Sequence, residues 1–452
     1  MMKKILLWYG LTFFASPLVI AQQTNFQSFS LKEAVQYALS KHPTIANARI
    51  DQQIATTQMK AQKAAFLPQI NAGAELAHYP TLQKVFFQPN LLLPNSTDNA
   101  VYTGSLQVPY GGLLQINASQ MIFNGAYLVG AKTAHLYTEL ASKAQQQTEE
   151  EVQLNVSKAY YNVLINQERI GLLEANIQRL TEALKSTEAA LQNGIVEKIE
   201  VDRLTVLLNN ATIEKDKFLA INDLGIALLK FQMNIPQEQD ITVKEKLANY
   251  TNLAKTNVPS PTPNGEFTHI SFELLATKKK IEEATMKNMR AGYYPSAYLF
   301  GNLGMNTGTN SLSGLFTPTN WYNFTAIGLR IQVPIFDGFL RKHEIQQKNL
   351  QVQKLTNQEI LLKNTLQLQE KQALVNLKNA KLSLQVHEQN IKLAQEILRI
   401  AQVKYKEGTN NQLELVNATV ALKEAEMNYQ QSIYEILLAD LEVKKLYGLL
   451  EK

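Results

Sequence analysis

Two kinds of hydrophobic pattern meet late in the chain, and each predicts a different element. From residue 326 to Val333, aliphatic residues alternate with small or polar ones, which predicts a strand with one apolar face. After Gly338 the alternation ends, and a charged, glutamine-rich segment continues to Glu407 without a proline or glycine. This segment predicts one very long helix joined directly to the strand.

Alternation of period two occurs in four segments. They are about 68–78, 103–123, 295–306 and 322–335. The pattern fits the half-buried strands of a soluble antiparallel sheet as well as the strands of a membrane β-barrel, but long, turn-rich loops between paired strands favour the barrel. Four strands cannot close a barrel, and an open edge in lipid would leave backbone groups unpaired. We therefore expect other chains to complete it, and three copies would give twelve strands.

The long polar segments carry apolar residues at alternating steps of three and four. In the first, this heptad pattern includes Val156, Val163, Ile170 and Ile177. The pattern predicts coiled-coil packing of long helices at 126–193 and 338–407. Return helices are expected at 197–232 and 411–448, which makes two helical hairpins. Further helices are expected at 31–66 and 270–289, the second in front of the strand at 295–306.

The order of these elements occurs twice, which indicates an internal two-fold repeat. The sequence SQMIFNGAYL at 119–128 matches QVPIFDGFLR at 332–341, and ALQNGIVEKIEV at 190–201 matches KYKEGTNNQLEL at 404–415. Phe123 precedes Gly194 by 71 residues, and Phe336 precedes Gly408 by 72. We expect a first copy at 22–256, a proline-rich connector at 257–267 and a second copy at 268–452.

The first residues and the composition limit the class of protein. Residues 1–21 have a basic start, an apolar stretch and a Val19-x-Ala21 cleavage pattern, which predicts a secretory signal peptide. Without it, the net charge of +5 falls to about +3, which is too small to indicate nucleic-acid binding. The chain has no cysteine, so packing alone must hold the exported protein together.

Enzyme motifs are missing from the sequence. The six histidines are scattered, and none has a partner at a recognised metal-binding spacing. His387 occupies a heptad position, where a packed histidine is the simpler reading than a ligand. Phosphate-binding glycine loops and Gly-x-Ser-x-Gly elbows do not occur either. We therefore predict a protein that is not an enzyme, with no cofactor, no catalytic residue and no metal site.

Several motifs resemble those of the TolC family of outer-membrane efflux proteins. They are SLKEAVQYALSKHPTI near the mature start, AAFLPQI before the first strand, IFNG and IFDG at the strand-to-helix junctions, and KYKEG before the second hairpin tip. Their order and duplication cover essentially the whole mature chain. The resemblance implies a mainly α homotrimer, in which a twelve-stranded outer-membrane β-barrel stands above a periplasmic α-barrel of long antiparallel coiled-coil helices.

The resemblance also implies a periplasmic aperture. The family has a tyrosine three residues before the second tip glycine, which is Tyr405 here, and acidic residues six and nine positions after it. These positions are Glu414 and Asn417, so only the first is acidic. The corresponding residues of the first copy are Glu200 and Arg203. Glu414 and Glu200 can equally be ordinary solvated residues near a helix N-terminus, where a carboxylate is favourable.

Two further sets of residues complete the candidate sites. The hairpin tips are candidates for docking a periplasmic adaptor, although glycine at a helix end has a simpler conformational explanation. Their residues are Asn193, Gly194, Ile195, Gly408, Thr409 and Asn410. The strand-to-helix junctions are expected to act as hinges, at Pro68, Phe123, Gly125, Pro295, Pro334, Phe336 and Gly338.

The function that fits these predictions is an outer-membrane exit channel of a Gram-negative bacterium that extends into the periplasm. The resemblance implies an inner-membrane pump of RND or ABC type and a periplasmic adaptor (membrane fusion) protein as partners, besides outer-membrane lipid. A soluble periplasmic coiled-coil scaffold or adaptor would also use long helical hairpins, but it should lack four alternating strands. A closed, ligand-binding barrel would leave the long helices unexplained.

Overall fold

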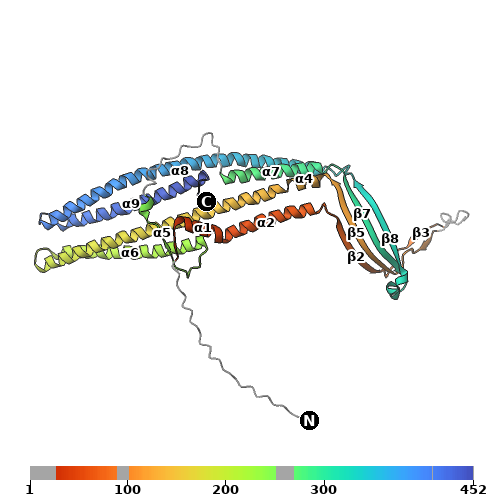
Figure 1. Cartoon of the computed structure of the whole chain (residues 1–452), viewed down its shortest axis with the longest axis horizontal. Coiled ribbons are helices and arrows are strands. Elements are labelled where there is room, and N and C mark those ends of the chain that lie inside the picture. Colours follow the sequence, from red (N-terminus) through yellow and green to blue (C-terminus); the bar gives the residue numbers. More distant parts are fainter. Residues whose placement is uncertain (1–26, 89–100, 251–268, 410, 451–452) are drawn as a thin grey trace, which may run out of the picture. The chain divides into compact units, whose positions relative to one another are not determined.

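The alternating segments form one four-stranded antiparallel sheet in the computed structural model (Figure 1). β5 begins later than position 103 because Pro109 has no N–H for the ladder, and β8 ends before Pro334 for the same reason. In order of hydrogen bonding, the strands are β2 (Gln69–His78), β5 (Tyr110–Asn124), β7 (Ser296–Thr309) and β8 (Trp321–Gln332).

The described chain falls into two units. The structure describes residues 27–88, 101–250, 269–409 and 411–450. The expected signal peptide at 1–21 and connector at 257–267 lie outside these ranges. Unit 1 takes its described residues from Met1–His42, Val152–Thr256 and Asn379–Leu438, and unit 2 takes them from Pro43–Glu151, Asn257–Lys378 and Ala439–Lys452.

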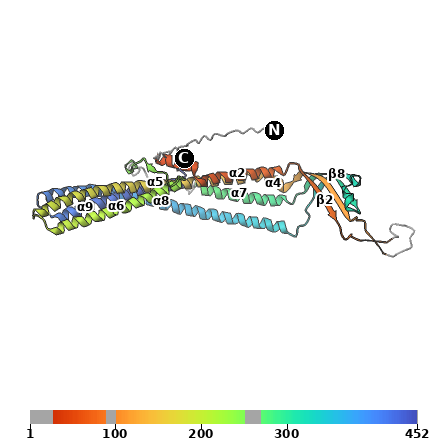
Figure 2. The same ribbon diagram turned by 90° about the horizontal axis from the view of Figure 1, so that it is seen from below.

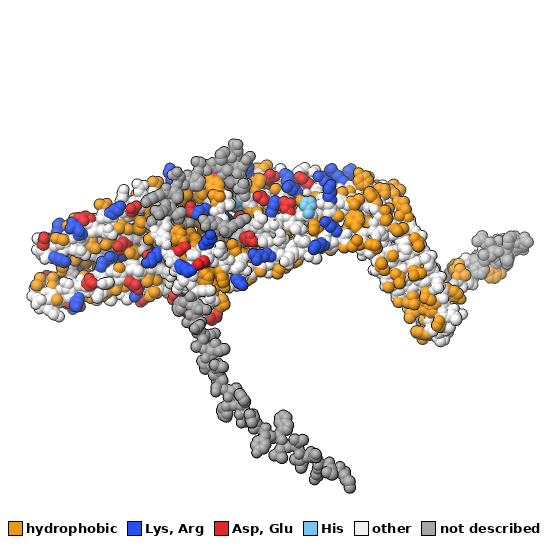
Figure 3. Space-filling model, in the orientation of Figure 1, with side chains coloured by type: hydrophobic (Ala, Val, Ile, Leu, Met, Phe, Trp, Pro, Cys, Tyr) orange, Lys and Arg blue, Asp and Glu red, His pale blue; other side chains and the backbone are white. Residues whose placement is uncertain are grey.

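The sheet, which belongs to unit 2, has two chemically different faces. Side chains leave a strand alternately on either side, so the register assigns each residue to a face. The apolar face carries Ile70, Leu76, Leu114, Ile116, Leu299, Leu303, Ile327, Leu329 and Ile331, all exposed. The polar face carries Asn71, Glu75, Gln115, Asn117, Ser119, Asn302, Asn306 and Arg330, together with Phe300 and Phe324. Figure 3 shows hydrophobic side chains gathered over this sheet.

Unit 1 contains the tip regions of two helical hairpins, and three of their four helices continue into unit 2. Hairpin 1 consists of α5 (His135–Gln192) and α6 (Lys198–Met233), and hairpin 2 consists of α8 (Leu340–Lys406) and α9 (Gln412–Leu446). In both ribbon views the helices of each hairpin run side by side (Figures 1 and 2). The heptad positions hold them together, since Val156, Val163, Leu173 and Leu180 are buried in α5.

The hairpin cores are small and close-packed. Between α8 and α9 lie Ala394, Leu398, Ala401, Ala418, Leu422 and Ala425. Alanine at half of these positions lets the two helix axes approach closely. A second cluster unites α5, α6 and α9 through Leu180, Leu204, Ala211 and Val416, so hairpin 1 also packs against hairpin 2.

The two long helices differ in continuity. Helix α8 has 67 residues without interruption, which at 1.5 Å per residue makes it about 100 Å long. The helix expected at 126–193 is interrupted at Ala134, between α4 (Gly125–Thr133) and α5. At this point Thr133 Oγ1 donates to Val129 O, and His135 Nδ1 lies 2.9 Å from Lys132 O. These side chains compete with the backbone for helical carbonyls.

Shorter elements complete the two units. The helix expected at 31–66 is divided into α1 (Leu31–Lys41) and α2 (Pro43–Ala64), because Pro43 cannot donate to the preceding turn. In unit 1, β1 (Gln27–Phe29) pairs in parallel with β6 (Ile241–Val243). Unit 2 also contains β3 (Val85–Phe87), β4 (Tyr102–Gly104), α7 (Ile270–Ala291) and the 3₁₀ helices η3 (Leu312–Phe316) and η4 (Pro318–Asn320).

Helices long and apolar enough to cross a membrane are absent from the described part of the chain.

Candidate functional site

The hairpin tips have nearly identical backbone geometry. Gly194 and Gly408 follow the last turns of α5 and α8 with φ of +71° each, in the left-handed region that favours glycine. The next residue donates its N–H back into the helix, from Ile195 to Ala190 O at 2.9 Å and from Thr409 to Lys404 O at 3.0 Å. Such caps satisfy the free carbonyls at a helix end. The residues around them, including Asn193, are exposed, while Asn410 lies outside the described residues.

Glu414 lies in the first turn of α9, the second helix of hairpin 2. Asn411 precedes the helix, and its Oδ1 accepts the backbone N–H of Glu414 at 3.1 Å. This N-cap fixes Glu414 at the positive end of the helix dipole. Asn417 lies one turn further along, and both side chains are exposed. Tyr405 is half-buried on the other side of the tip, where its carbonyl accepts the N–H of Gly408 at 3.1 Å.

Glu200 and Arg203 form an ion pair in the first turn of α6. Glu200 Oε1 lies 3.1 Å from Arg203 Nη1, while Glu200 Oε2 is buried and has no hydrogen-bond partner among the described residues. The nearby Gln412 is 5% exposed, and its Nε2 donates to Glu200 O at 3.4 Å. This bond brings together the first turns of α6 and α9. The sequence interpretation did not identify Gln412, because a glutamine in a glutamine-rich helix carries no distinguishing signal.

Polar pairs continue the contact between the two hairpins along unit 1. Lys423 Nζ of α9 lies 2.5 Å from Glu214 Oε2 of α6. Arg179 Nη2 of α5 lies 3.3 Å from Glu426 Oε2 of α9. A third pair joins Arg169 of α5 to Gln431 of α9. Hydrogen bonds and ion pairs require a narrower range of distance and direction than apolar contacts do. These pairs therefore fix the register between the hairpins.

Each hairpin also has an exposed apolar stripe. On α6 the stripe consists of Ile199, Val206, Ile213, Leu224 and Phe231, and on α8 of unit 1 it consists of Leu382, Val386, Leu393, Ile397, Ile400 and Val403. Leu224 is 71% exposed and Leu393 is 62% exposed. Steps of seven residues recur in both stripes, as expected of apolar helix faces that pack against another helix in a coiled coil.

The second strand-to-helix junction is held by aromatic and ionic contacts. Gly338 and Phe339 both have positive φ, +66° and +67°, before α8 begins. Phe336 meets Phe339 edge to face at 5.4 Å between ring centroids. Arg341 Nη1 donates to Gly292 O, and its guanidinium lies over the ring of Tyr293. These contacts stabilise a left-handed phenylalanine, a conformation that costs a residue with a Cβ of order 1 kcal/mol.

The first junction is compact in a different way. A Cβ on Gly125 would lie 2.8 Å from Ala291 O, so no larger residue fits there without movement. Asn124 Oδ1 caps α4 by accepting the Tyr127 N–H at 3.0 Å. Phe123 stands beside an irregularity in the ladder between β5 and β7. Of the other candidates, Pro68 and Pro295 are exposed and Pro334 is half-buried.

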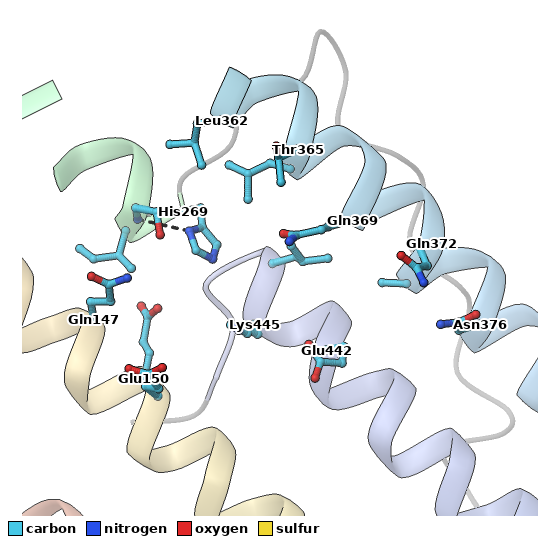
Figure 4. Close-up of a pocket in the computed structure, with 16 residues that line it drawn as sticks. Gln147, Glu150, His269, Leu362, Thr365, Gln369, Gln372, Asn376, Glu442 and Lys445 are labelled. Atoms are coloured by element: carbon cyan, nitrogen blue, oxygen red, sulfur yellow. Dashed lines mark hydrogen bonds between the residues drawn. The ribbon is translucent and has the colours of Figure 1, made fainter. Parts of the chain in front are cut away.

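Unit 2 contains an open cavity of about 470 Å³, which polar and apolar side chains line together (Figure 4). The side chain of His269 lies at its edge, between Gln369 of α8 and Glu150 of α5, and is 8% exposed. His269 Nδ1 accepts the N–H of Ser271 at 3.2 Å and so caps α7. Burial, and to a smaller extent the charge of Lys445, lowers the pKa of His269 below its usual value. Because Nδ1 accepts this hydrogen bond, the proton of the neutral ring would lie on Nε2.

Within the described ranges, no three or more His, Asp or Glu side chains are grouped so that they could hold an ion. His387, which the heptad pattern placed in a helix core, is half-buried on α8.

Comparison with known proteins shows which family the sequence matches. The family described as "Outer membrane efflux protein" matches residues 34–218 and 271–449. The outer membrane protein TolC of Vibrio cholerae serotype O1 is 22% identical over 428 residues, which cover 94% of this chain and 91% of that protein. The TolC of Escherichia coli (strain K12) is 20% identical over 445 residues, which cover 94% and 83%.

Solved structures share the fold. The Campylobacter jejuni CmeC outer membrane channel superposes with a TM-score of 0.72 at 17% identity, over 92% of this chain and 85% of that chain. The Neisseria gonorrhoeae MtrE outer membrane channel, solved in its open state, superposes with a TM-score of 0.70 at 17% identity, over 92% and 88%. At 17% identity, this likeness shows that the fold is shared.

Proposed function

Because this chain belongs to the outer membrane efflux protein family, we propose that it is the exit duct of a tripartite efflux or type I secretion system. Proteins of this family are transport channels of the outer membrane and not enzymes. The duct would receive its substrates from an inner-membrane pump of RND or ABC type and a periplasmic adaptor. Those partners would supply the energy of transport.

The observation that carries this proposal is a sheet that is open at both edges and apolar on one face. The outer edges of β2 and β8 have no partner strand within the described residues. An exposed row of aliphatic side chains suits lipid, and unpaired backbone groups cannot remain in lipid. Three copies of the four strands would close a twelve-stranded barrel, with the polar face lining its lumen.

The apolar stripes support the same three-fold closure in the helical part. The stripe on α6 and the stripe on α8 lie on different hairpins, so one copy can present its α6 stripe to the α8 stripe of the next. Such head-to-tail contacts form a closed ring when the rotation between copies divides a full turn. A homotrimer closed in this way would surround a periplasmic tube with helices.

Glu414 is our candidate for the aperture of that tube. In a trimer, three exposed Glu414 carboxylates would form a ring that attracts cations and repels anions. Asn417 adds no charge one turn away, and Glu200 is already paired with Arg203. The aperture would therefore carry one unpaired carboxylate per copy at these positions.

The two tip turns are the proposed contact for the adaptor. Ile195 is 74% exposed beside Gly194, and Thr409 is exposed beside Gly408. Small, exposed residues on a rigid turn let the end of another helical hairpin approach the backbone closely. The Ile195 side chain would supply the apolar part of the contact.

Membrane fractionation and gel migration test the proposal together. The mature protein, expressed with its signal peptide in a Gram-negative host, should appear in the outer membrane and require detergent for extraction. Unheated samples should migrate as a trimer and heated samples as a monomer. A monomer soluble in buffer would instead identify a periplasmic scaffold and reject the exit duct.

A further inference from the structure

The four strands of the sheet carry only two charged side chains, and both lie on the polar face. Among the Asp, Glu, Lys and Arg residues of these strands, β2 supplies Glu75 and β8 supplies Arg330. In the register, Glu75 pairs with Leu113, and Arg330 pairs with Tyr298. Both side chains are exposed. The electrostatic field along this face therefore depends on two residues.

Glu75 and Arg330 lie near opposite ends of the sheet. The row that contains Glu75 crosses the sheet through Leu113 and Asn306 to Tyr322 on β8. Arg330 lies eight residues further along β8, close to the junction with α8. At about 3.3 Å per residue, the two charges are separated by roughly 26 Å along the strands.

Arg330 is held in place by an aromatic ring that lies against bare backbone. Its guanidinium carbon is 5.3 Å from the centroid of the Phe300 ring. Phe300 in turn covers Gly328, where an added Cβ would lie 2.7 Å from Phe300 Cζ. A guanidinium over an aromatic face gains about 0.5–1 kcal/mol at an exposed site. Stacking on Phe300 therefore favours this position of the Arg330 side chain.

The charge of Arg330 remains available. Among the described residues, no carboxylate lies within 4.0 Å of its guanidinium, in contrast to Arg203 and Arg341, which have acidic partners. Arg330 is exposed. A planar anion can stack on its guanidinium and accept charge-assisted hydrogen bonds from the N–H groups.

We propose that Arg330, seated on Phe300, is a binding site for planar anionic solutes on the wall of the duct. The inference rests on the proposed function, because the polar face becomes a lumen wall only in the closed barrel. Three copies would place three guanidinium groups at the helical end of the barrel and three Glu75 carboxylates at the outer end. An outgoing anion would bind first at Arg330 and would then have to pass the Glu75 carboxylates, which repel it.

Planar-bilayer recordings of the purified trimer test this site, with pyrene tetrasulfonate as the planar anionic probe. Arg330→Gln should lower the anion-to-cation permeability ratio by roughly threefold or more and abolish the block by the dye. Arg330→Lys should keep the permeability ratio and weaken the block, because an ammonium group cannot stack as a plane. Phe300→Leu should weaken the block without changing the charge.

The controls separate this site from the duct itself. Glu75→Gln should raise the anion-to-cation ratio, and Asn302→Gln on the same face should leave ratio and block unchanged. Each variant is first checked for heat-labile trimers. Conducting Arg330→Gln trimers with wild-type ratio and block would overturn the anion site alone. A wild-type protein that forms no pores would overturn the exit duct, and the anion site with it.

Discussion

At the residue scale, we expect the carboxylate of Glu414 to have the most direct effect on conduction. Glu414→Ala should weaken the block of single-channel current by multivalent cations by about threefold to tenfold, because a ring of three charges would be lost. Glu174→Ala, which removes an exposed carboxylate from α5 away from the tip, is the matched control. An unchanged block in the Glu414 variant would reject the aperture role.

His269 makes the stability of unit 2 depend on pH. Because its pKa is lowered in the folded protein, the unfolded chain binds more protons below the usual histidine pKa of about 6.5. The contribution of His269 is therefore complete above that pH and is lost as the pH falls below it. Protonation would remove the acceptor Nδ1 that caps α7 and place a charge near Lys445.

Thermal unfolding between pH 5 and pH 8 measures this effect. The wild-type midpoint should fall with decreasing pH, whereas His269→Asn should show a flatter profile, because asparagine caps a helix without titrating in this range. His135→Asn is a useful control, since His135 is exposed. Equal slopes in the wild type and His269→Asn would contradict the expectation.

At the element scale, two glycines of β7 give a matched pair for testing the packing of the sheet. A Cβ on Gly304 would lie 2.5 Å from Leu114 O and 2.7 Å from Phe324 Cζ, whereas a Cβ on Gly301 meets nothing within 4 Å. Gly304→Ala should therefore destabilise the sheet by about 1–3 kcal/mol, and Gly301→Ala should be nearly neutral. The temperature at which trimers dissociate on gels distinguishes them, and equal temperatures would contradict the packing described.

The periodic elements could be predicted from the sequence, and the irregular ones could not. Heptads and alternation mark α5, α8 and the long strands, because apolar positions repeat over many residues. The interruption at Ala134 and the left-handed Phe339 depend on a few side-chain contacts that leave no period in the sequence. Strands β1 and β6 have three residues each and pair across more than 200 residues, so they cannot be recognised from the sequence either.

The candidate site divides in the same way. The tip glycines, Gly194 and Gly408, could be identified because a left-handed helix end selects glycine locally. The pairs Lys423 with Glu214 and Gln412 with Glu200 connect residues more than 200 positions apart. Only the packing of hairpin 1 against hairpin 2 brings them together, so one sequence alone does not reveal them.

At the scale of the whole molecule, the exposed stripes predict which surface holds three copies together. Leu393→Lys should convert trimers to monomers, because it would place a charge within the proposed apolar seam between α8 and the α6 of the next copy. Gln395→Lys, on the same helix but outside the stripe, should leave the trimer intact. Native mass spectrometry in detergent measures the oligomeric state of both variants. If Leu393→Lys remained trimeric, the α8 stripe would not be the contact between copies.

The interruption at Ala134 distinguishes the two long helical segments of each copy. Helix α8 is continuous over 67 residues, while α4 and α5 are separated by a joint. In a ring of three copies, the continuous α8 helices would alternate with the interrupted α4–α5 helices. Bending would then concentrate in every second long helix, so the tube would deform with three-fold and not six-fold symmetry.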